Sequence, residues 1–344
     1  MQKESIFEQL KQIIYFPKRD NIVDLKMVET LNVSDTEVSF NLVFEDLNDP
    51  GIKAMIENCT SIIQKEFGSN IKVEINPIAK KESGEGALSG VKHIIAIASG
   101  KGGVGKSTVA SNLAIALSKK GKKVALLDAD IYGPSMPIMF GLEGAQPSGT
   151  EVDGKPKVIP LEKHGIKILS IGFFVSADQA LIWRGPMASS ALNQLFNDAI
   201  WGEVDYMLID LPPGTSDIHL TLAQSYPVSG AILVTTPQQV AIADVKKAVS
   251  MFAQEKINVP VIGVVENMSY FTPAELPENK YYIFGKGNTE KFAKELNIPF
   301  LGDIPLVQSI AEGGDNGNPV ALQEDGPISE AYSKLAENLI RRIK

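Results

Sequence analysis

The chain has 344 residues, 44% of them hydrophobic, and carries a net charge of −8 with a pI near 5.1. This length predicts two domains, and the acidic balance argues against nucleic acid as a partner, because phosphate neutralisation needs clustered lysine and arginine. A single cysteine, Cys59, excludes an internal disulfide framework. The sequence has no long apolar run and no signal segment after Met1, which argues against a membrane partner. We therefore expect a cytoplasmic protein.

The first 78 residues predict a small α+β domain with the order helix, two strands, helix, strand. Apolar residues recur at helical spacing over 6–14 and over 52–63, whereas they alternate with polar residues over 38–44. The segment carries no catalytic constellation. Residues 20–28 resemble the small domain associated with iron–sulfur assembly factors.

Residues 79–90 are polar and rich in glycine, which is the composition of a flexible linker. From residue 91 to 344, strand and helix patterns alternate, and this predicts a mostly parallel sheet sandwiched between helices. Nearly continuous apolar runs, typical of strands buried on both faces, predict later strands at 123–128, 166–171, 206–210, 231–235, 261–265 and 300–304.

The first strand of this second domain, Ile94–Ala98, leads into a glycine-rich segment that fits the pattern G-x-x-x-x-G-K-[ST]. Between a strand and a helix, such a turn directs backbone N–H groups and the positive end of the helix dipole at an anion. Lys106 would reach the β- and γ-phosphates, and the Ser107 hydroxyl would ligate Mg²⁺. A glycine-rich turn without a ligand would give no role to Lys106 or Ser107. The predicted phosphate loop is Gly100, Lys101, Gly102, Gly103, Val104, Gly105, Lys106, Ser107 and Thr108.

Carboxylates follow two of the predicted strands. Asp210 comes directly after four apolar residues, as a Walker B element requires, because its carboxylate must face Mg²⁺ from a rigid sheet edge. Asp128 ends the strand at 123–128 and Asp130 comes just beyond it, where a carboxylate beside a triphosphate orients water or holds the outer shell of the metal. Helix N-capping is an alternative role for both. Ligands of parallel sheets bind at the carboxyl ends of the strands, so we expect these residues to meet the phosphate loop.

The loop, with its second lysine at position 101, resembles the deviant Walker A motif of the MinD/ParA and nitrogenase iron protein group of P-loop ATPases. This resemblance implies that Lys101 contacts the nucleotide of a partner subunit across a dimer interface. It also implies that Asp130 positions the attacking water, that Pro212-Pro213-Gly214 forms the switch that senses the γ-phosphate, and that Asn267 contacts the adenine ring.

Longer matches are similar to the Mrp/ApbC iron–sulfur cluster carriers: residues 128–135, 183–187, 210–217 and 266–270. Members of that family are ATP-binding dimers that hold a cluster between subunits and deliver it to apo-proteins. The resemblance therefore implies ATP and Mg²⁺ as cofactors, and the iron–sulfur assembly machinery and apo-protein clients as partners.

One departure concerns the cluster itself. The carriers have a C-x-x-C where this chain has residues 270–277, and this segment contains no cysteine. Prolines and carboxylates do not replace soft thiolate ligands. His93, His164 and His219 are scattered along the chain, and Cys59 offers one sulfur, so no iron–sulfur ligands are identifiable from the sequence.

We therefore expect a homodimeric, Mg²⁺-dependent ATPase that hydrolyses ATP slowly and carries or assembles iron–sulfur clusters. Lys101, Lys106 and Asp130 are its catalytic candidates, and Ser107 and Asp210 are the Mg²⁺ candidates. One alternative is a MinD/ParA-like positioning switch, because an apolar helical stripe runs from Ile328 to Ile343 and ends among basic residues. That stripe also fits an ordinary packed helix. The other alternative is a regulatory scaffold that binds no cluster.

Overall fold

The structure is a computed structural model that describes residues 3–17, 19–25, 27–34, 36–44, 49, 51–79, 88–174, 185–255, 257–273, 275–276 and 278–343. The chain divides into two compact units, Met1–Ser83 and Gly84–Lys344. Each unit has a hydrophobic core of its own. Most of the predicted linker, residues 80–87, lies outside the described residues.

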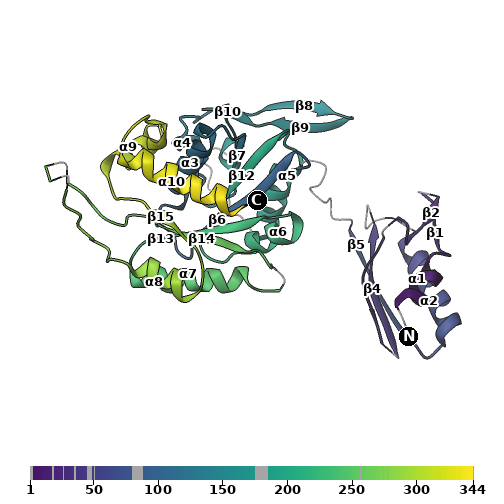
Figure 1. The fold of residues 1–344 in the computed structure, drawn as a ribbon. Coiled ribbons are helices and arrows are strands. Elements are labelled where there is room, and N and C mark those ends of the chain that lie inside the picture. Colours follow the sequence, from purple (N-terminus) through teal and green to yellow (C-terminus); the bar gives the residue numbers. More distant parts are fainter. Residues whose placement is uncertain are drawn as a thin grey trace. The chain divides into compact units, whose positions relative to one another are not determined.

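The first unit is a three-stranded sheet with two helices (Figure 1). Strand β4 lies between antiparallel β3 and parallel β5, and its residues Val38, Phe40, Leu42 and Phe44 are buried, as the alternation predicts. A two-residue ladder, β1 with β2, was not predicted because it has no apolar pattern. The elements are α1 (Lys3–Leu10), β1 (Ile14–Tyr15), β2 (Asp20–Asn21), β3 (Val28–Val33), β4 (Glu37–Phe44), α2 (Ile52–Phe67) and β5 (Lys72–Ala79).

The second unit is built on an eight-stranded sheet with the order β10-β11-β7-β12-β6-β13-β14-β15, in which only β10 is antiparallel to its neighbour among the described strands. Helices α3 and α10 lie on one side of it and α7 and α8 on the other (Figure 1). The predicted α/β fold is thereby confirmed. Its strands are β6 (Val91–Ala98), β7 (Val124–Asp128), β10 (Leu161–Lys163), β11 (Ile166–Ser170), β12 (Val204–Asp210), β13 (Gly230–Thr235), β14 (Val261–Glu266) and β15 (Phe300–Asp303).

The remaining elements connect and cover these strands. A hairpin of β8 (Ser148–Val152) and β9 (Lys155–Ile159) was not predicted, because its side chains are largely exposed and show no apolar alternation. The helices are α3 (Lys106–Lys119), α4 (Met136–Met139), α5 (Gly185–Asn197), α6 (Asp217–Ser225), α7 (Gln239–Phe252), α8 (Asn288–Glu295), α9 (Gln308–Asp315) and α10 (Pro327–Arg342), with the 3₁₀ turns η1 (Ile171–Phe173) and η2 (Val320–Leu322).

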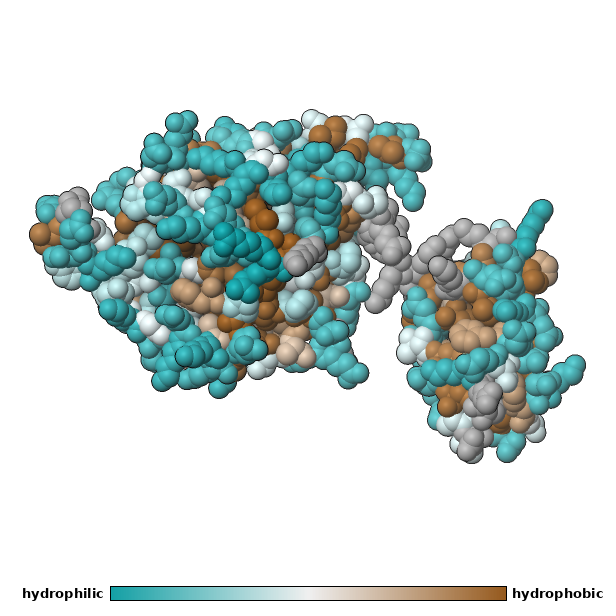
Figure 2. Space-filling model, viewed as in Figure 1, coloured by the Kyte–Doolittle hydropathy of each residue, from teal (hydrophilic) through white to brown (hydrophobic). Residues whose placement is uncertain are grey.

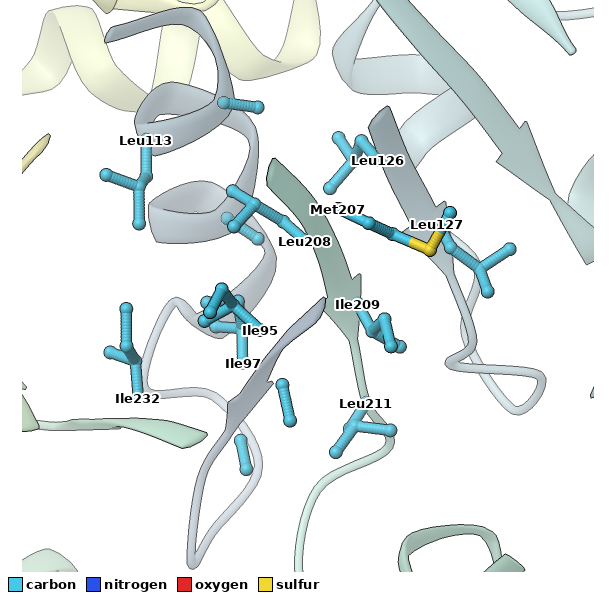
Figure 3. Close-up of a cluster of buried hydrophobic side chains, with 14 of the residues drawn as sticks. Ile95, Ile97, Leu113, Leu126, Leu127, Met207, Leu208, Ile209, Leu211 and Ile232 are labelled. Carbon is cyan, nitrogen blue, oxygen red and sulfur yellow. The ribbon is translucent and has the colours of Figure 1, made fainter. Parts of the chain in front are cut away.

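The central strands form the most deeply buried part of the core. Side chains of β6, β7 and β12 lie together with Leu113 of α3 in Figure 3, and all those labelled there are fully buried. Because β6, β7 and β12 are neighbours, their carboxyl ends meet at one edge of the sheet. The packed core therefore fixes where the residues after Ala98, Asp128 and Asp210 lie.

The C-terminal apolar stripe belongs to this core. Tyr332, Leu335, Ala336 and Leu339 of α10 are almost completely buried, and α10 packs against α3, β15 and η2. An amphipathic helix that binds a surface would leave this stripe unpaired, so the stripe gives no support to a positioning switch. None of the described helices is long and apolar enough to span a bilayer.

Replacing Leu339 by alanine tests this assignment. Loss of a fully buried leucine side chain should lower the free energy of unfolding by about 2–5 kcal/mol. Both tryptophans of the chain, Trp183 and Trp201, belong to the second unit, so their fluorescence during urea unfolding reports that unit. The exposed Arg341→Ala is the matched control and should change stability by less than about 0.5 kcal/mol. Equal effects of the two substitutions would place α10 outside the core.

Candidate functional site

The loop between β6 and α3 has a backbone that only glycine adopts without strain. Gly103 and Gly105 both have φ of +80°, and Gly105 is the residue that precedes the first turn of α3. At Gly100 a Cβ would lie 2.2 Å from the backbone carbon of Asp244. Gly100 therefore packs directly against the backbone of α7, and Gly103 and Gly105 turn the chain into α3, whose first backbone N–H groups have no partner within the helix. This is the geometry of an anion cradle.

Lys106, the first residue of α3, is buried in a cluster of carboxylates. Its Nζ lies 2.6 Å from Oδ1 of Asp210 and 3.6 Å from Oδ2 of Asp130. It also donates to Oγ of Ser107 over 3.4 Å. A buried ammonium is stable only when such partners compensate its charge. The structure thus brings together the four side chains that the sequence predicts for phosphate, metal and water.

Asp128 organises the segment that follows β7. Its Oδ2 accepts from the Ser170 hydroxyl at 2.9 Å and from the backbone N–H groups of Ser135 and Met136. Burial, followed by the negative charge of Asp210, raises the pKa of the Asp128 carboxyl to about 7, although these donors oppose the shift. Asp128 therefore anchors the start of α4 from outside that helix, next to the site.

Asp130 and Asp210 each keep one buried oxygen that has no hydrogen-bond partner in the part of the chain that the structure describes: Oδ1 of Asp130 and Oδ2 of Asp210. Burial raises the pKa of Asp130, and the ammonium of Lys106 opposes this rise. Unsatisfied buried carboxylate oxygens are costly, and they accept well from water or a hard cation. The arrangement therefore suits a Mg²⁺ ion and an ordered water beside the loop.

The turn after β12 lies against the phosphate loop. The N–H of Gly214 donates to the carbonyl of Ser99 over 2.9 Å, and a Cβ on Gly102 would contact the ring of Pro213 at 3.9 Å. Gly214 has φ of +82°, so it supplies the freedom that the two prolines before it lack. Lys101 is exposed at the outside of the same loop.

Asn267 reaches the loop from the end of β14. Its Nδ2 donates to the carbonyl of Val104 over 2.9 Å, and its own N–H donates to the carbonyl of Thr235 over 2.7 Å. A Cβ on Gly105 would lie 2.2 Å from Nδ2 of Asn267, so this approach requires glycine. The adenine contact that the resemblance implies stays a prediction. The contact with the loop was not predicted.

Other predicted features lie away from this cluster. Cys59 is fully buried in the first unit, where burial raises its pKa to about 12 and makes it a poor ligand. Among the described residues, no three histidine, cysteine, aspartate or glutamate side chains form a metal-binding group. Trp183 and Arg184, together with Ala274 and Pro277, lie outside the described residues.

His219 is a buried residue near the site for which the sequence analysis found no role. The N–H of Ser216 donates to its Nδ1 over 3.2 Å, so the pair closes the first turn of α6 immediately after the turn at Gly214. Burial lowers the pKa of His219 to about 4, and the backbone carbonyl of Ser216, which lies 3.3 Å from Nδ1, opposes this shift because it would accept from the protonated ring. The spacing S-x-x-H could have indicated this role of His219, because a capping box has the spacing S-x-x-E or S-x-x-Q.

His219 should make the stability of the second unit depend on pH. Its pKa is lower in the folded state than the ordinary 6.5, so its stabilising effect is complete above pH 6.5 and is lost as the pH falls towards 4. Between pH 6.5 and pH 4, the free energy of unfolding of wild type should fall by about 3 kcal/mol more than that of His219→Gln, a variant that preserves the capping box. Urea titrations followed by tryptophan fluorescence measure this difference. The partly exposed His93→Gln is the control, and parallel curves for wild type and His219→Gln would contradict the assignment.

Comparison with known proteins identifies relatives of this chain. Residues 90–340 match the family model described as ParA, NUBPL iron-transfer P-loop NTPase. The chain is 42% identical over 332 residues to an iron-sulfur cluster carrier protein of Synechocystis, covering 94% of this chain and 92% of that one. It also resembles the structure of a nucleotide-binding protein from Archaeoglobus fulgidus in complex with ADP, with 36% identity, a TM-score of 0.62 and coverage of 72% of this chain and 95% of that one.

The MinD cell division protein of Aquifex aeolicus shares the fold, with a TM-score of 0.50 at 22% identity, over 72% of this chain and 97% of that chain. The resemblance read from the phosphate loop and the acidic strand ends is thus confirmed. The chain belongs to the ParA/NUBPL iron-transfer family of P-loop NTPases.

Proposed function

We propose that this protein binds and hydrolyses ATP and carries or assembles iron–sulfur clusters for delivery to apo-proteins. The observation that carries the proposal is the buried Lys106, held between Asp130 and Asp210 directly below a glycine-rich anion cradle. The names of relatives, such as the iron-sulfur cluster carrier protein of Synechocystis, support the choice of cargo. A cytoplasmic location is part of the proposal, since the single cysteine is free.

The residues of the site act by position and charge. Backbone N–H groups of the loop and the ammonium of Lys106 bind the phosphates, and Asp130 aligns the water that attacks the γ-phosphate. Ser107 and Asp210 would hold Mg²⁺, whose charge offsets that of the phosphate oxygens. No covalent intermediate is needed, and slow turnover is part of the proposal.

The position of Lys101 supports a homodimer. It is exposed at the loop, whereas Lys106 already serves the phosphates from within the same chain. We propose that Lys101 reaches the nucleotide of a second copy, so that two chains close over two nucleotides. A single-copy mass for wild type in saturating non-hydrolysable ATP would refute this arrangement.

The described residues offer no ligands for the iron–sulfur cluster itself. Residues 270–273 contain no thiolate, and Cys59 is buried in the other unit. These two observations favour a second candidate function, in which the protein regulates cluster assembly as a scaffold without holding a cluster. The two functions share the nucleotide site and differ only in iron binding.

Lys106→Ala tests the nucleotide site. Removal of the buried ammonium takes away the main cation for the phosphates and leaves Asp210 uncompensated, so ATP affinity should fall more than about 100-fold. Calorimetric titration with a non-hydrolysable ATP analogue measures the affinity. Lys120→Ala, which removes an ion pair with Glu337 on the surface, is the matched control and should bind as wild type does. Tight binding by folded Lys106→Ala would refute the assignment.

Anaerobic reconstitution with ferrous iron and sulfide tests the cargo. A carrier should acquire the visible absorption of a cluster, which a chelator then removes. Because Cys59 is buried, Cys59→Ser should give the same result as wild type, whether or not a cluster is acquired. Loss of the absorption in Cys59→Ser alone would make this cysteine a ligand and contradict the structure. No absorption in either protein would favour the scaffold.

A further inference from the structure

The carboxyl end of β11 lies at the edge of the sheet that carries the nucleotide site. Ser170, the last residue of β11, is paired with Asp128 of β7, which is in turn paired with Asp210 of β12. Hydrophilic residues cover much of the visible face of the second unit (Figure 2), whereas these three residues are completely buried. A buried hydroxyl is costly unless it is hydrogen-bonded, so the partners of Ser170 indicate what it does.

The hydroxyl of Ser170 is held on both sides. The N–H of Gly172 donates to its Oγ over 3.0 Å, and the hydroxyl donates to Oδ2 of Asp128 over 2.9 Å. A serine hydroxyl has a single hydrogen, so this donor is committed to the carboxylate. Hydrogen bonds to an ionised acceptor are stronger than those between neutral groups. Ser170 therefore fixes the orientation of the Asp128 carboxylate from the neighbouring strand.

Asp128 passes this constraint on to the segment 130–136. Its Oδ1 accepts from the N–H of Asp130 over 3.2 Å. Its Oδ2 accepts from the N–H groups of Ser135 and Met136 over 3.0 and 3.1 Å. One carboxylate thus holds the backbone at both ends of the segment. A rotation of the carboxylate would break these hydrogen bonds together.

The turn that follows β11 supports the same segment by packing. A Cβ on Gly172 would lie 3.1 Å from Cβ of Pro134 and 3.0 Å from Cγ of Pro137, so the backbone of Gly172 lies directly against both rings. Close-packed groups leave no free volume into which the segment could shift. The end of β11 therefore holds the segment through contact as well as through hydrogen bonds.

The carboxylate of Asp130 needs this support. Its Oδ1 is buried and has no hydrogen-bond partner in the described part of the chain, so it is the atom that can accept from an attacking water. The backbone of Asp130, which donates to Asp128, sets where this atom lies. A misplacement of about 1 Å in a reacting group can slow a reaction roughly 100-fold.

We propose that Ser170 is a positioning residue for ATP hydrolysis. Through Asp128 it holds the backbone of Asp130 in the place from which the Asp130 carboxylate aligns the attacking water. This inference rests on the proposed ATPase function and adds to it a residue from β11. Ser170 acts in this way on the hydrolytic step and not on the binding of the nucleotide.

Ser170→Ala in the full-length protein tests this role. Loss of the donor to Asp128 should lower kcat for phosphate release from ATP about tenfold. The affinity for a non-hydrolysable ATP analogue, measured by calorimetry, should stay within about twofold of wild type. Ser229→Ala is the control, because Ser229 lies just before β13, at the amino end of the sheet, where its Oγ accepts from the N–H of Ile94 over 3.1 Å. It should keep the wild-type kcat.

The same substitution in the Asp130→Ala background separates positioning from a general effect. Without the Asp130 carboxylate there is nothing left for Ser170 to position, so Ser170→Ala should change the remaining rate by less than about twofold. Single-turnover phosphate release with the protein in excess measures the slow rates of both backgrounds. The two substitutions are thus expected to be strongly non-additive.

The outcomes distinguish this inference from the function on which it rests. Absence of phosphate release from wild type would overturn both. An unchanged kcat in Ser170→Ala, or the same tenfold loss in the Asp130→Ala background, would overturn the positioning role alone. An equal loss of kcat and of analogue affinity would assign Ser170 to binding or to the fold, and would also overturn it. A loss of kcat that occurs only when Asp130 is present, with affinity retained, establishes the role.

Discussion

A buried lysine between two carboxylates is the interaction on which the site depends. Lys106 is 6% exposed and Asp210 is fully buried, so neither charge would be tolerated alone. The order β7-β12-β6 brings the ends of three neighbouring strands to this one point. Phosphate binding then offers Lys106 a further anion, and Asp210 becomes available to a metal ion. The same pair therefore compensates two buried charges and prepares the site for its ligand.

Local patterns in the sequence predict the parts of the molecule that are determined locally. Nearly continuous apolar runs predict the central strands, because strands buried on both faces exclude polar residues. The spacing from Gly100 to Ser107 predicts the cradle, because only such a backbone exposes its N–H groups to phosphate. The position of Asp210 after an apolar run predicts its meeting with Lys106.

Contacts between distant segments leave no such pattern. The hydrogen bond from Asn267 to Val104 depends on the pairing of β13 with β14 and β6, and nothing in either segment alone indicates it. The β8–β9 hairpin is missed because its exposed residues are not patterned. His219 had a local signal in its spacing from Ser216, but its burial, which determines its charge, is a tertiary property.

The segment that follows β14 contains no cysteine and exposes large apolar side chains. Its exposed apolar side chains include Phe271, Leu276 and Ile283, while Lys106, Ser107, Asp130 and Asp210 lie together at the phosphate loop.

The affinity of Asp210→Asn for a non-hydrolysable ATP analogue, with and without Mg²⁺, tests the central claim most directly. Lys106 loses its closest carboxylate in this variant, so binding without Mg²⁺ should be tighter than in wild type, and Mg²⁺ should add little. An unchanged response to Mg²⁺, together with unchanged binding in its absence, would show that Asp210 neither competes for Lys106 nor serves the metal.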